Sequence, residues 1–104
     1  MKKILSRMAL ATVAGASAIA ATAVPAHAAT VIGGINITQQ CRVQYGASWS
    51  AIVLDAGNPY SWRCTWSGYQ YGVNLDAGCV NQYGSGAFSI LLDPHNAYSW
   101  RCAR

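Results

Sequence analysis

The sequence predicts a small α+β domain that is stapled by disulfides and built from two helix–strand–turn–strand repeats related by a pseudo-two-fold. Three observations predict it. Residues 34–66 align without a gap with residues 72–104, at an offset of 38, and 15 of the 33 aligned positions are identical. The four cysteines occupy equivalent positions in the two copies. Each copy also carries one helical pattern followed by two short strand patterns, as expected for a tandem repeat of one structural unit.

Residues 1–28 are predicted to be a secretory signal peptide. Three basic residues, the last of them Arg7, precede an apolar, alanine-rich segment that ends near Ala23. The sequence Ala26-His27-Ala28 then fits a cleavage site. The apolar segment is short for a bilayer span, which needs about 20 strongly apolar residues; an uncleaved anchor is the alternative. We therefore expect a secreted, extracellular protein whose single mature domain is residues 29–104.

The predicted mature chain is rich in aromatic residues and poor in charge. It holds all four Trp, all six Tyr and the one Phe of the sequence, and it has no Lys or Glu. Its four Arg against three Asp give a net charge of 4 − 3 = +1, because most of the +4 of the whole sequence lies in the leader. This balance offers no basic patch for nucleic acid or for an anionic membrane. We expect no nucleic-acid partner and no membrane insertion after the leader is cleaved.

The four cysteines predict a disulfide framework. A small exported domain usually needs such covalent links, and the cysteine count is even. A zinc site is the alternative, but it favours close pairs of ligands, and here Cys41 and Cys64, like Cys79 and Cys102, are 23 residues apart. Pairing within each copy, Cys41–Cys64 and Cys79–Cys102, gives each repeat its own link, worth about 3 kcal/mol. Pairing between the copies would also respect the symmetry.

Each copy is predicted to open with a short helix. In the second copy, Asn74 stands at the N-cap position, Asp76 lies in the first turn and Gly84 follows the last turn. The first copy repeats this pattern between Asn36 and Gly46. Between the caps, residues spaced at i, i+4 and i+8 form one face: Ile37, Cys41 and Tyr45, and then Leu75, Cys79 and Tyr83.

A strand, a turn and a second strand are expected to follow each helix. Residues 51–54 and residues 89–92 are short apolar runs, which are typical of buried strands. The Asp, Asn, Gly and Pro residues of segments 55–59 and 93–96 favour a turn, because Asp and Asn side chains bond the local backbone and Pro presets φ.

The second strand is expected at residues 60–64 and at the equivalent residues 98–102. The alternation places Tyr60, Trp62 and Cys64 on an inward face and Ser61 and Arg63 on an outward face. This pattern predicts a half-buried strand that returns beside the first one in a hairpin.

The chain offers little for catalysis. His95 is the one histidine of the predicted mature chain, and Asp55, Asp76 and Asp93 are its only carboxylate side chains. No nucleophile elbow, phosphate-binding glycine loop or metal-binding motif is present in the sequence. We expect no enzymatic activity, no cofactor and no metal.

The composition favours binding, and a carbohydrate or cell-wall polymer is the leading prediction. Sugars present apolar C–H faces and hydroxyl edges, which suit aromatic rings that combine an apolar face with a polar group. The hairpins repeat a set of Asp, Asn, Tyr and Arg residues, and two such sites would gain from multivalency on a polymer. Aromatic residues that one copy alone carries, Trp49, Trp66, Tyr69 and Tyr71, form a second candidate surface. The predicted ligand-binding residues are Asp55, Asn58, Tyr60, Arg63, Asp93, Asn96, Tyr98, Arg101, Trp66 and Tyr69.

Both copies end in Tyr-Ser-Trp-Arg-Cys, at residues 60–64 and 98–102. Together with the preceding Gln-Tyr-Gly and Leu-Asp-Xaa-Xaa-Asn, this ending resembles a group of small secreted actinobacterial proteins with tandem Cys-paired repeats. The resemblance implies export and implies no particular activity. An alternative function is inhibition of a secreted protease or glycosidase, because a small rigid domain loses little entropy on binding; the partner would then be a secreted enzyme.

Overall fold

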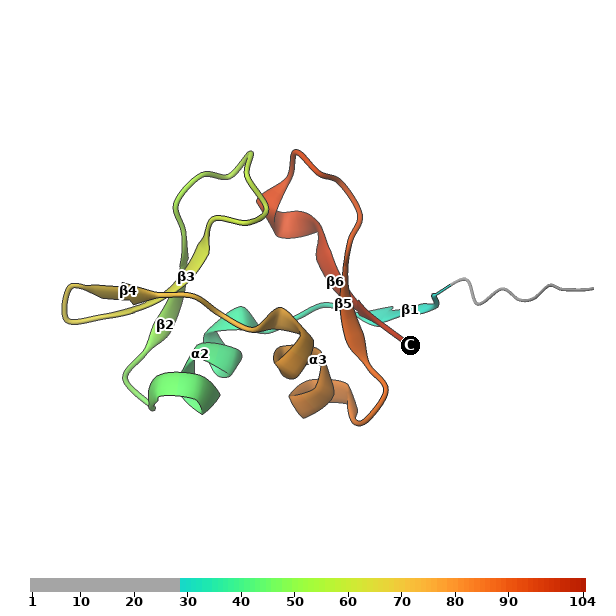
Figure 1. Cartoon of the computed structure of the whole chain (residues 1–104), viewed down its shortest axis with the longest axis horizontal. Helices are drawn as coiled ribbons and strands as arrows, with labels where there is room; N and C mark the ends of the chain where they lie inside the picture. Colours follow the sequence, from blue (N-terminus) through green and yellow to red (C-terminus); the bar gives the residue numbers. More distant parts are fainter. Residues whose placement is uncertain (1–28) are drawn as a thin grey trace, which may run out of the picture.

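The structure is a computed structural model, and it describes residues 29–104; the predicted signal peptide, residues 1–28, lies outside the described residues. Two similar halves lie side by side (Figure 1). The first half contains β1 (Val31–Gly33), α2 (Ile37–Tyr45), β2 (Ser50–Val53) and β3 (Trp62–Trp66). The second half contains β4 (Tyr69–Tyr71), α3 (Leu75–Tyr83), β5 (Phe88–Leu91), the 3-10 turn η3 (Ala97–Ser99) and β6 (Trp100–Ala103). No helix within this described part is long and apolar enough to cross a bilayer.

The structure confirms the α+β fold, and it adds one strand to each half. The two antiparallel sheets have the strand orders β2-β3-β4 and β1-β6-β5. The first strand of each half therefore completes the sheet of the other half. In one sheet Cys64 pairs with Tyr71, and in the other Cys102 pairs with Gly33 at the equivalent position. The two halves are thus joined by a reciprocal exchange of edge strands.

The predicted helices are confirmed, together with their caps. The side-chain oxygen of Asn36 accepts a hydrogen bond from the N–H of Gln39, and that of Asn74 accepts one from Ala77. Gly46 and Gly84 end the two helices with φ of 135° and 99°, values that favour glycine. The helices lie next to each other below the two hairpins (Figure 1).

The predicted disulfides are also confirmed. Cys41 is bonded to Cys64 and Cys79 to Cys102, so each link ties a helix to the last strand of its own half. All four cysteines are fully buried, and they form the centre of two small hydrophobic clusters. Because few large apolar side chains are buried around them, these links supply much of what a larger core would otherwise provide.

The alternation predicted for residues 60–64 is wrong at its first two positions. Tyr60 is 69% exposed, whereas Ser61 is 4% exposed. The Ser61 hydroxyl turns into the loop, where it accepts a hydrogen bond from the N–H of Asp55 (3.0 Å) and lies 2.8 Å from the carbonyl oxygen of Asn58. These local bonds hold the chain in a turn, so β3 begins only at Trp62.

The two halves meet through hydrogen bonds that obey the pseudo-two-fold. Each bond has a counterpart 38 residues away in the chain. The indole N–H of Trp62 donates to the carbonyl of Ala97, and that of Trp100 donates to the carbonyl of Pro59. The hydroxyl of Tyr45 donates to the carbonyl of Gly72, and that of Tyr83 donates to the carbonyl of Gly34. The backbone N–H of Asn74 donates to Oε1 of Gln44, and that of Asn36 donates to Oε1 of Gln82.

Candidate ligand-binding sites

Two cavities of about 440 Å³ each lie between the halves. Every residue that lines one cavity has its 38-residue counterpart in the lining of the other. One cavity, here called the Arg63 cavity, combines Tyr60 and Arg63 of the first half with the start of α3. The other, the Arg101 cavity, combines Tyr98 and Arg101 of the second half with the start of α2. Their size falls within the range of small-ligand sites.

Trp62 and Trp100 line both cavities. Their indole N–H groups donate to the carbonyls of Ala97 (2.7 Å) and Pro59 (2.8 Å) in the opposite hairpin. Tyr98 meets Trp62 edge-on at a centroid distance of 5.8 Å, and Tyr60 meets Trp100 in the same way at 5.9 Å. The aromatic walls of the two cavities are therefore held in place by contacts between the halves.

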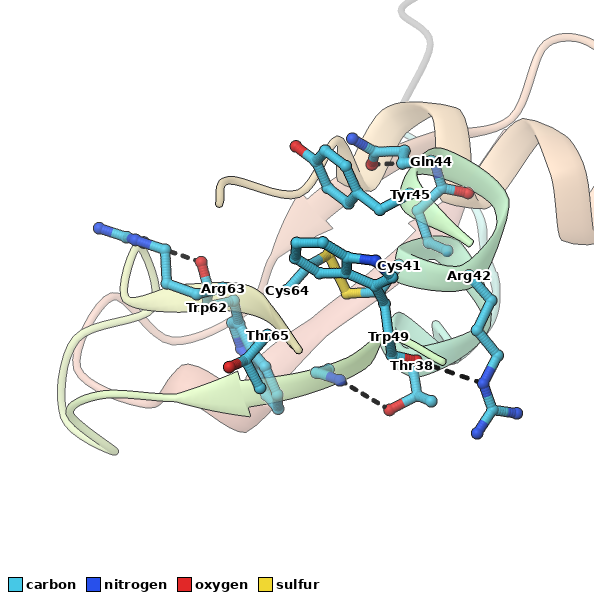
Figure 2. Close-up of a disulfide and its surroundings, with 12 residues drawn as sticks. Thr38, Cys41, Arg42, Gln44, Tyr45, Trp49, Trp62, Arg63, Cys64 and Thr65 are labelled. Carbon is cyan, nitrogen blue, oxygen red and sulfur yellow. Dashed lines mark hydrogen bonds between the residues drawn. A yellow bond between two sulfur atoms is a disulfide. The ribbon is translucent and has the colours of Figure 1, made fainter. Parts of the chain in front are cut away.

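The arginine of each cavity is anchored at one end. Arg63 is half-buried, and its NH1 group donates to the carbonyls of Tyr60 (3.0 Å) and Trp62 (2.8 Å); Figure 2 shows the latter bond. Arg101 repeats both bonds with Tyr98 (3.0 Å) and Trp100 (2.7 Å). Each guanidinium therefore has a fixed orientation and is not simply a solvated surface charge.

The two cavities differ in charge. The Arg63 cavity contains Asp76, whose Oδ1 accepts hydrogen bonds from the hydroxyl and from the backbone N–H of Ser89, both at 2.7 Å. These two bonds lower the pKa of Asp76 below its ordinary value of 3.8, the hydroxyl having the larger effect, while desolvation opposes them. At the equivalent place the Arg101 cavity has Thr38, whose hydroxyl accepts from the N–H of Ala51 (3.1 Å). The lining of the Arg101 cavity contains no carboxylate.

A second feature is a continuous group of aromatic rings on and beside the β2-β3-β4 sheet, here called the aromatic surface: Tyr45, Trp49, Trp66, Tyr69 and Tyr71. Trp49 stacks on Tyr71 (5.4 Å between centroids) and Tyr71 on Tyr69 (6.0 Å). Trp49 also contacts Tyr45 (4.9 Å) and Trp66 (6.1 Å). Trp66, Tyr69 and Tyr71 are 48%, 55% and 46% exposed.

Trp49 connects this surface to the core. Figure 2 shows its indole beside the Cys41–Cys64 disulfide, with the ring of Tyr45 next to it. Ala87 holds the equivalent place beside the other disulfide. Since the second half closes its cluster with a methyl group, the large ring of Trp49 is not required by the architecture.

The β1-β6-β5 sheet lacks the counterparts of the other exposed rings as well. The positions equivalent to Trp66, Tyr69 and Tyr71 are held by Arg104, Val31 and Gly33. Arg104 donates from NH2 to the carbonyl of Tyr83 (2.7 Å) at the end of α3, a favourable place for a cation. Gly33 admits no side chain, because a Cβ there would overlap the hydroxyl of Tyr83.

The structure divides the ten predicted ligand-binding residues into three groups. Tyr60 and Arg63 line one cavity and Tyr98 and Arg101 the other, while Trp66 and Tyr69 belong to the aromatic surface. The remaining four lie in the hairpin turns and line neither cavity: Asp55, Asn58, Asp93 and Asn96.

The turn residues use their side-chain oxygens on their own backbone. Asp55 accepts from the N–H of Gly57 and Asn58 from that of Tyr60; the second hairpin repeats both bonds. Sequence reasoning did not single out the pairs that distinguish the cavities, Thr38 with Ala51 and Asp76 with Ser89. The alignment of the two repeats shows that Thr38 is replaced by Asp76 and Ala51 by Ser89. These two differences were the signal in the sequence that could have identified the pairs.

Within residues 29–104, no group of three or more His, Cys, Asp or Glu side chains is arranged to hold a metal ion. No protein-family model matches the chain, and comparisons with curated proteins and with solved structures find no match. The function is therefore inferred from the cavities and the aromatic surface.

Proposed function

We propose that the protein is a secreted, non-enzymatic module that binds a carbohydrate or a cell-wall polymer through the aromatic surface. The observation that supports this most is that the β2-β3-β4 sheet carries the surface and the equivalent β1-β6-β5 sheet does not. Exposed rings that the fold can do without are better explained by binding than by stability. The two buried disulfides, the predicted leader and the resemblance to small exported proteins support the location outside the cell.

The chemistry of the surface suits sugars. The hydroxyl of Tyr45 already donates to the carbonyl of Gly72. Within the described part of the chain, in contrast, no partner satisfies the indole N–H of Trp66 or the hydroxyls of Tyr69 and Tyr71. Rings with unused polar edges can pack against the C–H face of a sugar and hydrogen-bond its hydroxyls at the same time. Several adjacent rings would let one polymer chain make several such contacts.

Retention on insoluble polysaccharides tests the proposal. The oxidised protein is incubated with chitin, cellulose and peptidoglycan, and a glycan array extends the search to soluble sugars. We expect retention on at least one of these. A folded sample that is retained on none of the solids and binds nothing on the array would refute the proposal.

The repeat supplies a matched variant. Trp66→Arg and Tyr69→Val together introduce the residues that stand at the equivalent positions beside the other sheet, Arg104 and Val31, so the fold should tolerate both. We expect this double variant to bind the polymer about tenfold more weakly or worse, because 1.4 kcal/mol of lost contact is tenfold in affinity. Phe88→Ser is the control: Phe88 is an exposed ring outside the surface, and its counterpart is Ser50.

A second candidate function is inhibition of a secreted protease or glycosidase. The observation that favours it is the two-residue turn Ser67-Gly68, which joins β3 to β4 with φ of 50° and 85° and has no counterpart between β1 and β6 within residues 29–104. It presents Trp66 and Tyr69 on a rigid hairpin, and a preorganised hairpin loses little entropy on binding. Titration against a panel of secreted hydrolases separates the two functions. An inhibitor abolishes the hydrolysis rate of its target enzyme once one molecule of the protein is present per enzyme molecule.

A further inference from the structure

We propose that the Arg101 cavity is a second binding site and that it binds a small sugar acid. The ligand class is the uronic acids, in which a saturated ring carries a carboxylate. The cavity is distinct from the aromatic surface: none of the five aromatic-surface residues lines it. The inference therefore does not rest on the proposed function. Its support comes from the arginine, the aromatic walls and the contrast with the Arg63 cavity.

Arg101 is prepared to bind a carboxylate. Its NH1 group is held by the carbonyls of Tyr98 and Trp100. Its Nε and NH2 groups have no hydrogen-bond partner among residues 29–104, and no bond joins it to an Asp there. A guanidinium with a fixed plane and unused donors matches the two oxygens of a carboxylate.

The walls of the cavity suit a compact ring. Trp62 and Trp100 present indole surfaces whose positions are fixed by hydrogen bonds to the opposite hairpin. Ile35 and Ile37 add apolar surface, and the phenol of Tyr98, which is 57% exposed, stands at the same cavity. Because these groups are ordered before a ligand arrives, binding does not require them to be immobilised.

The Arg63 cavity is a built-in comparison. It has an arginine held in the same way and the same pair of indoles, but it also contains the carboxylate of Asp76. A ligand carboxylate there would meet a like charge, which disfavours binding. The Arg101 cavity has neutral Thr38 at that position. We therefore infer that one of the two otherwise equivalent cavities accepts an anionic ligand.

Titration by two-dimensional NMR of the 15N-labelled, oxidised protein tests the inference. Sodium glucuronate is the probe, glucose is the same ring without a carboxylate, and acetate is a carboxylate without the ring. We expect glucuronate to shift the resonances of Thr38, Tyr98 and Arg101, and added salt to weaken the effect. Shifts of equal affinity with glucose or with acetate, or glucuronate shifts confined to other residues, would overturn it.

Exchange of single residues between the repeats makes the test specific. Thr38→Asp places a carboxylate in the Arg101 cavity, as Asp76 does in the other cavity. We expect this variant to bind glucuronate at least about fivefold more weakly. Asp76→Thr removes the carboxylate from the Arg63 cavity, and we expect a second set of shifts around Arg63. Unchanged affinity in the first variant and a single site in the second would contradict the inference.

Two further variants separate the site from other effects. Arg101→Gln should lose glucuronate binding, and its folding is checked by the dispersion of its spectrum. The variant with Trp66→Arg and Tyr69→Val should bind glucuronate as the unmodified protein does, because it alters the aromatic surface alone. If it lost glucuronate binding as well, the cavity would not be an independent site, and the inference would be wrong.

Discussion

Gln40 and Gly78 hold equivalent positions in the two helices, and the side chain of Gln40 lies against the backbone of Gly78. A Cβ added to Gly78 would lie 3.3 Å from both Cβ and Cγ of Gln40. Gln40 is 1% exposed, and its amide donates to Oε1 of Gln44 and accepts from Asn81. Near a pseudo-two-fold axis, equivalent positions meet each other, so one large and one small residue fill a space that two large ones would overfill. This contact therefore accounts for the difference between the two repeats at this position.

The first prediction follows from this contact. We expect Gly78→Gln to lower the free energy of unfolding by about 1–3 kcal/mol, the usual cost of overpacking, although Gln is the better helix former. Urea unfolding followed by tryptophan fluorescence measures the change. Gly72→Ala is the control, because a Cβ there meets nothing within 4 Å. If the Gly78 variant were as stable as the unmodified protein, the two helices would not be closely packed where Gln40 meets Gly78. Adding Gln40→Gly to Gly78→Gln should recover part of the loss.

The second prediction concerns acid stability. The pKa of Asp76 is lowered in the folded state by its two hydrogen bonds from Ser89. A carboxyl with a depressed pKa contributes stability above its unfolded pKa and loses that contribution as the pH falls through the folded pKa. We therefore expect the stability difference between the unmodified protein and Asp76→Asn to be constant near neutral pH. It should shrink once the pH falls below the ordinary value of 3.8.

Urea unfolding at a series of pH values, from neutral to about pH 2, measures that difference. Ser89→Ala keeps the backbone N–H and removes the hydroxyl, which has the larger effect on the pKa. In that variant the folded-state pKa of Asp76 should move back toward its ordinary value, so the carboxylate should contribute less stability and the acid loss should be smaller and complete at a higher pH. A difference that stays constant down to the lowest pH would show that the Ser89 bonds do not favour the charged carboxylate.

Local signals in the sequence predicted the local structure well. Asn36 and Asn74 cap the helices and Gly46 and Gly84 end them, because capping depends on residues only a few positions apart. The repeat also favoured the observed pairing of Cys41 with Cys64 and of Cys79 with Cys102.

Features that depend on distant residues were not predicted. Strand β4 consists of Tyr69, Gln70 and Tyr71, all exposed, so no alternation of burial marks it. Its partner β3 belongs to the other half, as does the partner of β1. The cavities also depend on contacts between distant residues, because each is lined from both repeats. The spacing of residues within one repeat cannot show which residues of the other repeat they meet.

The third prediction tests the exchange of edge strands. The N–H of Thr30 donates to the carbonyl of Arg104 (3.1 Å), and the N–H of Arg104 donates to the carbonyl of Thr30 (3.0 Å). The equivalent strands β3 and β4 are joined by the turn Ser67-Gly68. We expect a circular permutant of residues 30–104, opened between Ser67 and Gly68 and closed by a Ser-Gly link from Arg104 to Thr30, to fold with both native disulfides, because every strand keeps its partner.

Disulfide mapping by mass spectrometry and a thermal unfolding curve measure the outcome. The permutant should show both native pairs and one cooperative transition. The control is a permutant closed by the same link but opened between Arg63 and Cys64, which cuts β3 in its centre and should not fold, because β3 is the middle strand of its sheet. If the first permutant gave mixed disulfides or no cooperative transition, β1 could not be an exchanged edge strand equivalent to β4. The closed, reciprocal arrangement of the two halves would then be wrong.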